Sequence, residues 1–120
     1  MAKIIGIVGS RRRNSDSDFY AVVKKFKEIY KEGDWICSGG CPQGGDYFAE
    51  KIHRRLSTPF LLFPANWEKH GKSAGFIRNT DIAKASDVLI ACVSDDRTGG
   101  TEDTIRKFVE FHGDKNLHIV

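Results

Sequence analysis

Short apolar runs of strand length alternate along this chain with longer amphipathic segments of helical period. Residues 3–8 and 88–93 are the clearest runs, and both are rich in aliphatic, β-branched side chains. Weaker runs over residues 35–37, 59–63 and 117–120 bring the expected strands to five. When strands and helices alternate in this way, right-handed crossovers produce a parallel sheet that helices cover on both faces.

Four amphipathic helices are expected between these strands. Asp16 or Ser17 can cap the start of the first helix, and Gly33 can end it. Residues 74–86 form the third helix, and residues 64–73 before it are predicted to be a polar loop. The apolar stripes that mark the other three helices are Phe19, Val22, Val23, Phe26, Ile29 and Tyr30; Phe48, Ala49, Ile52 and Leu56; and Ile105, Phe108 and Val109.

Together these elements predict one α/β domain over residues 1–120. It is Rossmann-like and three-layered, with a five-stranded, mainly parallel sheet in the order 3-2-1-4-5 and helices on both faces. The length of 120 residues suits a single domain with a real hydrophobic core. Hydrophobic residues make up 40% of the chain and charged residues 29%, which is typical of globular proteins and argues against disorder.

Composition also limits the environment and the partners. The net charge of +3 permits an anionic ligand but does not require nucleic acid, so a nucleic-acid partner is not expected. No apolar run approaches the roughly 20 residues of a membrane-spanning helix, and the N-terminus has no signal-peptide layout. We therefore expect no membrane association and a cytoplasmic location. Cys37, Cys41 and Cys92 are expected to be reduced thiols, and no metal site is predicted because no second close pair of Cys or His completes a zinc pattern.

The ends of the expected strands carry the unusual residues. In open parallel sheets, ligands bind beyond the carboxyl ends of the strands, near the point where the strand order reverses. Glycine-rich or polar segments follow the first four strands, at residues 9–11, 38–46, 65–67 and 95–101, whereas the loops from helix to strand are ordinary turns. Seven of the 12 glycines fall in three of these segments, which predicts a binding site at this edge of the sheet.

Glycines at strand ends are candidates for phosphate binding. They let the backbone approach a ligand, and a helix that starts there presents free N–H groups and a partial positive charge. A tight turn explains Gly9 and Ser10 equally well. Four glycines within residues 39–45 are a stronger signal, because glycine is entropically costly and a simple connector would not need them. The candidates after the second and fourth strands are Gly39, Gly40, Gly44 and Gly45, and Gly99, Gly100 and Thr101.

Polar and aromatic side chains flank these segments. Arg11 begins a run of three arginines that is either a solvated face or a phosphate contact. Asp46 either caps the second helix or accepts hydrogen bonds from ribose hydroxyls. Trp67 either stacks on a base or covers the edge of the core. The remaining candidates, which border the long loop at the same edge, are Lys72, Arg78 and Asn79.

No catalytic constellation stands out. The glycine-rich loops lack the Gly-Lys-Ser/Thr ending of a nucleotide-hydrolysing phosphate loop, and the Gly-x-Gly-x-x-Gly pattern is absent after the first strand. Glu50, Glu102 and Asp103, together with Asp46, are the catalytic candidates, because cleavage of an N-glycosidic bond needs a carboxylate beneath the ribose. Glu102 and Asp103 can equally complement the dipole of the last helix.

The strand-end segments form a combined pattern that runs from Gly9 to about Phe108. It comprises residues 9–11, 38–46, 49–50, 63–67, 71–72, 74–75 and 78–79. This pattern resembles the SLOG superfamily, and most closely its YspA-like branch. The resemblance implies a Rossmann-like fold with a pocket for nucleotides or nucleotide derivatives, such as ADP-ribose or NAD-like molecules. Because relatives often self-associate, it also implies a homodimer.

More distant relatives differ in what such a pocket does. Some are ligand sensors, and DprA-type relatives bind single-stranded nucleic acid. LOG enzymes are phosphoribohydrolases that cleave an N-glycosidic bond, using a Pro-Gly-Gly-x-Gly-Thr-x-x-Glu motif that binds phosphate and supplies a catalytic glutamate. The corresponding stretch here is residues 98–104, and the glutamate position falls on Thr104.

Three functions therefore remain open. The first is binding or sensing of a nucleotide or a nucleotide-derived small molecule. The second is hydrolysis or transfer at the N-glycosidic bond of a nucleotide or nucleoside. The third is single-stranded nucleic-acid binding, against which the modest net charge argues. No cofactor is predicted beyond a nucleotide or ADP-ribose-like ligand.

Overall fold

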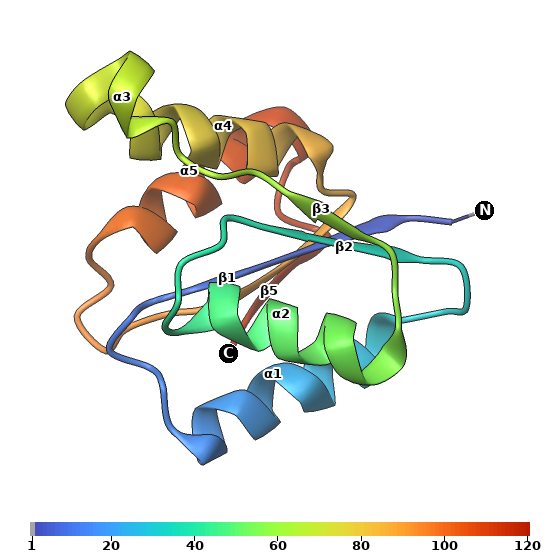
Figure 1. The fold of residues 1–120 in the computed structure, drawn as a ribbon. Coiled ribbons are helices and arrows are strands. Elements are labelled where there is room, and N and C mark those ends of the chain that lie inside the picture. The colour runs from blue at the N-terminus through green and yellow to red at the C-terminus, as the bar shows by residue number, and fades with distance from the viewer. Residues whose placement is uncertain (1) are drawn as a thin grey trace.

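The computed structural model describes residues 2–120, which form a parallel sheet between two layers of helices (Figure 1). The strands are β1 (Ile4–Gly9), β2 (Trp35–Ser38), β3 (Phe60–Leu62), β4 (Val88–Cys92) and β5 (Leu117–Ile119). The helices are α1 (Asp16–Ile29), α2 (Gly45–Leu56), α3 (Trp67–His70), α4 (Ala74–Ala85) and α5 (Gly100–His112), with a 3₁₀ turn over Gly71–Ser73 between α3 and α4.

The sheet has five strands in the order β3-β2-β1-β4-β5, and every neighbouring pair is parallel. Both the predicted order and the predicted direction are confirmed. The chain moves outward from β1 through β2 to β3, then returns to the other side of β1 for β4 and β5, so the order reverses between β1 and β4. Gly9 pairs with Cys92, which places the carboxyl ends of these two strands side by side.

Each face of the sheet has its own apolar core, because successive side chains of a strand point to opposite faces. In β1, Ile5 and Ile7 contribute to the core beneath α1 and α2, whereas Val8 contributes to the core beneath α4 and α5. In β4, Ile90 contributes to the core beneath α1 and α2, and Leu89 contributes to the core beneath α4 and α5. Figure 1 shows the two pairs of helices on opposite sides of the sheet. This double burial explains why the strands are continuous apolar runs in the sequence.

The start of α1 differs from the prediction. Ser15 caps this helix, rather than Asp16 or Ser17. The Ser15 hydroxyl accepts a hydrogen bond from the N–H of Asp18 at 3.1 Å, and the Asp18 carboxylate accepts one from the N–H of Ser15 at 3.2 Å. This reciprocal capping box satisfies two free N–H groups at once and therefore fixes the first turn one residue earlier than predicted.

Other helix details also differ from the prediction. The extended backbone of Tyr30 ends α1, so Gly33 is not its cap and lies, with a φ of +96°, in the turn before β2. Leu56, in the last turn of α2, is 50% exposed and does not belong to the buried stripe. Residues 64–73 are not an irregular loop, because Asn66 caps the short helix α3 within them. In the part of the chain that the structure describes, no helix is long and apolar enough to cross a membrane.

Candidate functional site

A pocket of about 320 Å³ opens at the carboxyl end of β1, where the strand order reverses. The loops that follow β1 and β4 form two of its sides, and residues of the segment after β2, of α4 and of the start of α5 form the others. Ligands bind at this position in open parallel sheets. The lining residues are Val8, Gly9, Ser10, Arg11, Arg12, Cys41, Asp46, Arg78, Asn79, Ile82, Thr98, Gly99, Gly100, Thr101 and Thr104.

The pocket brings together most of the residues that the sequence suggested for ligand binding. They come from segments far apart in the chain, and the parallel sheet aligns them at one edge. Those that line the pocket are Gly9, Ser10, Arg11, Asp46, Arg78, Asn79, Gly99, Gly100 and Thr101. Their role in ligand binding stays a prediction. The other candidates, Gly39, Gly40, Gly44, Gly45, Trp67 and Lys72, do not line it.

Gly44 and Gly45 serve the packing of α2 against β1 instead of the pocket. A Cβ atom on Gly45 would lie 2.2 Å from the carbonyl carbon of Val8, and one on Gly44 would lie 2.4 Å from the carbonyl oxygen of Ser10. Gly44 also has a φ of +74°, in the region that favours glycine. The two glycines therefore let the first turn of α2 press directly onto the end of β1.

Gly39 supports the pocket indirectly. A Cβ atom there would lie 2.4 Å from Nη1 of Arg78, and the Gly39 carbonyl oxygen accepts a hydrogen bond from this Nη1 at 2.9 Å. Gly39 therefore makes room for the arginine and holds it. Gly40, with a φ of +80°, packs toward Leu62 outside the pocket.

Trp67 and Lys72 lie outside the pocket lining. Trp67 is 59% exposed at the start of α3, with its ring over Gly75 of α4, and Lys72 is exposed in the 3₁₀ turn. The sequence reasoning treated residues 64–73 as one loop at the binding edge, but α3 directs this segment outward along the end of α4 (Figure 1).

The carboxylates at the start of α5 do not face the pocket. Glu102 forms two hydrogen bonds with the guanidinium of Arg97, at 2.8 and 3.0 Å. Asp103 is buried and accepts hydrogen bonds from Nδ2 of Asn79 at 3.1 Å and from Nζ of Lys107 at 2.9 Å. Each carboxylate therefore pairs with a cation of the protein, and neither lines the pocket.

Asp46 is the carboxylate that lines the pocket within residues 2–120. It is not the cap of α2, which is Gly44. Its two oxygens accept hydrogen bonds from the Ser38 hydroxyl at 2.8 Å and from the N–H of Cys41 at 3.1 Å. Glu50, the third catalytic candidate, points elsewhere and pairs with Arg54 at 2.7 Å. Any carboxylate chemistry in this pocket would depend on Asp46.

Arg78 carries a positive charge into the pocket wall without a carboxylate partner. Its Nη1 donates to the Gly39 carbonyl oxygen at 2.9 Å, and its Nε donates to Oδ1 of Asn79 at 3.1 Å. Both acceptors are neutral. Across residues 2–120 no Asp or Glu oxygen lies within ion-pair distance of Arg78 or of Arg11, which also lines the pocket. A half-buried guanidinium with neutral partners is suited to an anion from outside the chain.

The first turn of α5 adds hydrogen-bond donors to the same wall. Its cap residue is Gly99, with a φ of +102°, which has no side chain that could bond to the first N–H groups of the helix. Gly99, Gly100 and Thr101 all line the pocket. Unpaired N–H groups at the positive end of a helix dipole attract phosphate.

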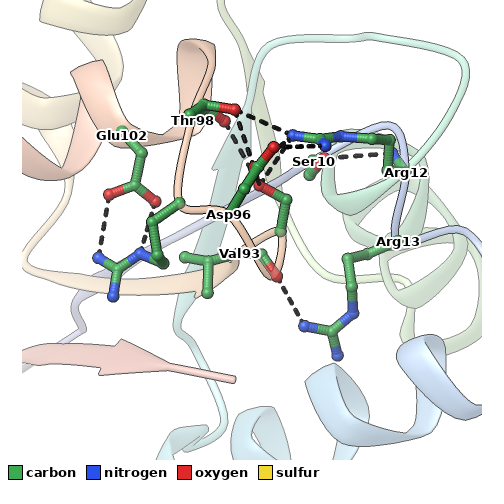
Figure 2. A network of polar contacts seen from close by, with 9 residues as sticks. Ser10, Arg12, Arg13, Val93, Asp96, Thr98 and Glu102 are labelled. Carbon is green, nitrogen blue, oxygen red and sulfur yellow. Dashed lines mark hydrogen bonds and ion pairs between the residues drawn. The ribbon is translucent and has the colours of Figure 1, made fainter.

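Arg12, the second residue of the arginine run for which the sequence leaves a solvated face or a phosphate contact open, also lines the pocket. It extends from the loop after β1 to the loop after β4, where its Nη1 and Nη2 donate to Asp96 at 2.8 and 2.7 Å (Figure 2). This contact holds the pKa of Asp96 well below its ordinary value. Arg13 points away and donates to Asp18 and to the Val93 carbonyl oxygen. The lining residues that the sequence did not single out for ligand binding are Val8, Cys41, Ile82, Thr98 and Thr104.

The sheet order and the pocket at its reversal point define a Rossmann-like α/β domain with a polar, cation-lined cleft. Comparison of the chain with models of known families, with curated proteins and with solved structures found no match. The chemistry of the pocket is therefore the basis on which a function can be proposed.

Proposed function

We propose that this chain binds a nucleotide, or a nucleotide-derived small molecule such as ADP-ribose, through a phosphate group in the pocket between β1 and β4. The observation that carries the proposal is Arg78, whose guanidinium bonds only to neutral oxygens in the pocket wall. A phosphate would supply the missing negative charge with two parallel hydrogen bonds. The free N–H groups of Gly100 and Thr101 line the same pocket and favour the same group.

The rest of the pocket suits a sugar. Asp46 presents a carboxylate whose oxygens have each accepted one hydrogen bond, so each retains capacity for a ligand hydroxyl. Carboxylates of this kind bind ribose hydroxyls in dinucleotide sites. Ile82 and Val8 add apolar surface to the lining. A compound with a phosphate at one end and a hydroxylated sugar beside it therefore matches the distribution of groups, in agreement with the resemblance to the SLOG superfamily.

Cys41 offers a built-in reporter of pocket occupancy. It lines the pocket and is half-buried, whereas Cys37 and Cys92 are 0% exposed. Burial also raises the pKa of Cys37 to about 11 and raises the pKa of Cys92, which suppresses their reactive thiolates. We expect N-ethylmaleimide to add once, at Cys41. ADP at about ten times its Kd should slow this reaction roughly tenfold, because about a tenth of the pockets are then empty.

Intact-mass spectrometry over time measures this reaction. The Cys41→Ser variant should acquire no adduct, and adenosine, which lacks phosphate, should protect Cys41 far less than ADP. Equal labelling rates with and without saturating nucleotide, for ADP, ADP-ribose and AMP alike, would contradict the proposed pocket.

We expect no release of adenine from AMP. Glu50, Glu102 and Asp103 do not line the pocket, and both carboxylate oxygens of Asp46 already accept hydrogen bonds from Ser38 and Cys41. N-glycosidic cleavage needs a carboxylate that faces the developing oxocarbenium charge. Chromatography of AMP incubated with the protein measures free base. Adenine that forms with the wild-type protein and disappears with Asp46→Asn would replace the binding proposal with a hydrolase.

A further inference from the structure

The loop after β4 holds a carboxylate directly against one of the pocket cations. Asp96 accepts two hydrogen bonds from Arg12, and Nη2 of Arg12 also lies 3.1 Å from Oγ1 of Thr98. Thr98 lines the pocket and immediately precedes Gly99, the cap of α5. The guanidinium of Arg12 therefore lies beside the helix start where a ligand phosphate is proposed to bind (Figure 2).

The Arg12–Asp96 pair is suited to exchange. Its side chains are 59% and 53% exposed, and ion pairs this exposed contribute little net stability. The neighbouring Arg13–Asp18 pair is only 25% and 16% exposed and is supported by the carbonyl oxygens of Val93 and Val120. Arg12 also donates from Nη2 to the hydroxyl oxygens of Ser94 and Thr98, each at 3.1 Å. Arg13 is thus tied to main-chain carbonyl oxygens, whereas the partners of Arg12 are side chains that can rotate, so Arg12 can change partners at smaller cost.

Asp96 would keep hydrogen bonds after losing Arg12. Its Oδ1 also accepts hydrogen bonds from the hydroxyls of Ser94 at 2.8 Å and Thr98 at 2.9 Å. The backbone N–H of Arg12 donates to Oγ of Ser10, so the main chain stays anchored while the side chain moves. Neither partner is left as an isolated buried charge when the pair opens, which removes the usual obstacle to breaking a salt bridge.

We propose that Asp96 occupies the place of a second ligand phosphate on Arg12. This inference rests on the proposed function and names the ligand class: compounds with two adjacent anionic groups, such as nucleoside diphosphates. The first phosphate binds at Arg78 and the start of α5. The second displaces Asp96 from Arg12, so the pocket prefers diphosphates to monophosphates.

Calorimetric titration with ADP and AMP, without divalent cations and at fixed ionic strength, tests the exchange. Arg12→Gln should weaken ADP binding roughly tenfold or more, since charge-assisted hydrogen bonds are lost, and should change AMP binding little. Asp96→Asn should tighten ADP binding roughly two- to fivefold, because Arg12 is freed from its exposed competitor. Glu102→Gln is the matched control: it removes one negative charge near the same loop, from the pair with Arg97, which lies outside the pocket lining.

The outcomes separate the exchange from the proposed function. Tighter ADP binding by Asp96→Asn than by Glu102→Gln supports the exchange. Weaker binding of both nucleotides by Asp96→Asn would instead mean that the Arg12–Asp96 pair is a fixed structural contact. An unchanged ratio of ADP affinity to AMP affinity in Arg12→Gln would exclude a second phosphate site at Arg12. In either of these cases the proposed function stands. If the wild-type protein binds neither of these nucleotides nor ADP-ribose, both proposals fall.

Discussion

Replacing Arg78 with glutamine is expected to weaken ADP binding about 100-fold while leaving the fold intact. Arg78 brings an uncompensated positive charge to the pocket, and its loss removes two charge-assisted hydrogen bonds to the phosphate. Such bonds contribute roughly 1.5 kcal/mol each at the lower end of their range, and about 3 kcal/mol in total corresponds to a change in Kd on the order of 100-fold. Within the protein the bonds to the Gly39 carbonyl oxygen and to Asn79 are lost as well, so we expect some loss of stability, and a urea denaturation curve of Arg78→Gln must show that the variant is still folded.

Two further variants sharpen this result. Arg78→Lys keeps the charge but loses the paired donors of the guanidinium, so its affinity for ADP should lie between those of the wild type and Arg78→Gln. Arg54→Gln removes the same charge from an exposed pair on α2, away from the pocket, and should bind normally. If calorimetry finds that Arg78→Gln binds ADP as tightly as Arg54→Gln does, the charge of Arg78 does not contribute to ligand binding.

Gly45→Ala should lower the free energy of unfolding by about 3 kcal/mol, the upper range for forcing an extra methyl group into a packed site. The new Cβ would lie 2.2 Å from the carbonyl carbon of Val8 and 2.3 Å from the nitrogen of Gly9. Because both are backbone atoms of β1, neither can rotate away, and α2 must shift. Urea denaturation measures the effect.

Gly100→Ala provides the matched control. Gly100 is also the first residue of a helix, but a Cβ atom there would meet its nearest neighbour, Nδ2 of Asn79, at 3.8 Å, which is ordinary contact. Its stability should stay within about 0.5 kcal/mol of the wild type. Equal urea midpoints for Gly45→Ala and Gly100→Ala would mean that α2 does not press on β1 as described.

The fold could be predicted from the sequence because local pattern and general topology rules agree. β1 and β4 are continuous apolar runs, as strands buried on both faces must be. The handedness of crossovers then leaves few arrangements for five alternating strands. Helix ends were less predictable: Ser15, Asp16 and Ser17 are all good caps, and only the reciprocal bond with Asp18 distinguishes Ser15.

The pocket could be located from the sequence, but the partners of its side chains could not. The segments after β1 and β4 meet because parallel strands end at one edge. The contact between Arg12 and Asp96 spans 84 positions and has no local signature. Gly44 and Gly45 show a different limit: a glycine required for close packing and a glycine required for ligand approach look the same in a sequence.

A titration of the ¹⁵N-labelled protein with ADP, followed by NMR, tests the central claim most directly, because it reports on each proposed contact separately. We predict saturable shifts that are largest at the backbone N–H groups of Gly100 and Thr101 and at the Nε–H of Arg78. Two results would contradict the proposed phosphate site. One is the absence of shifts at these positions up to about 1 mM ADP, a concentration that corresponds to a binding free energy of about −4 kcal/mol. The other is shifts confined to a different surface, such as that around Trp67.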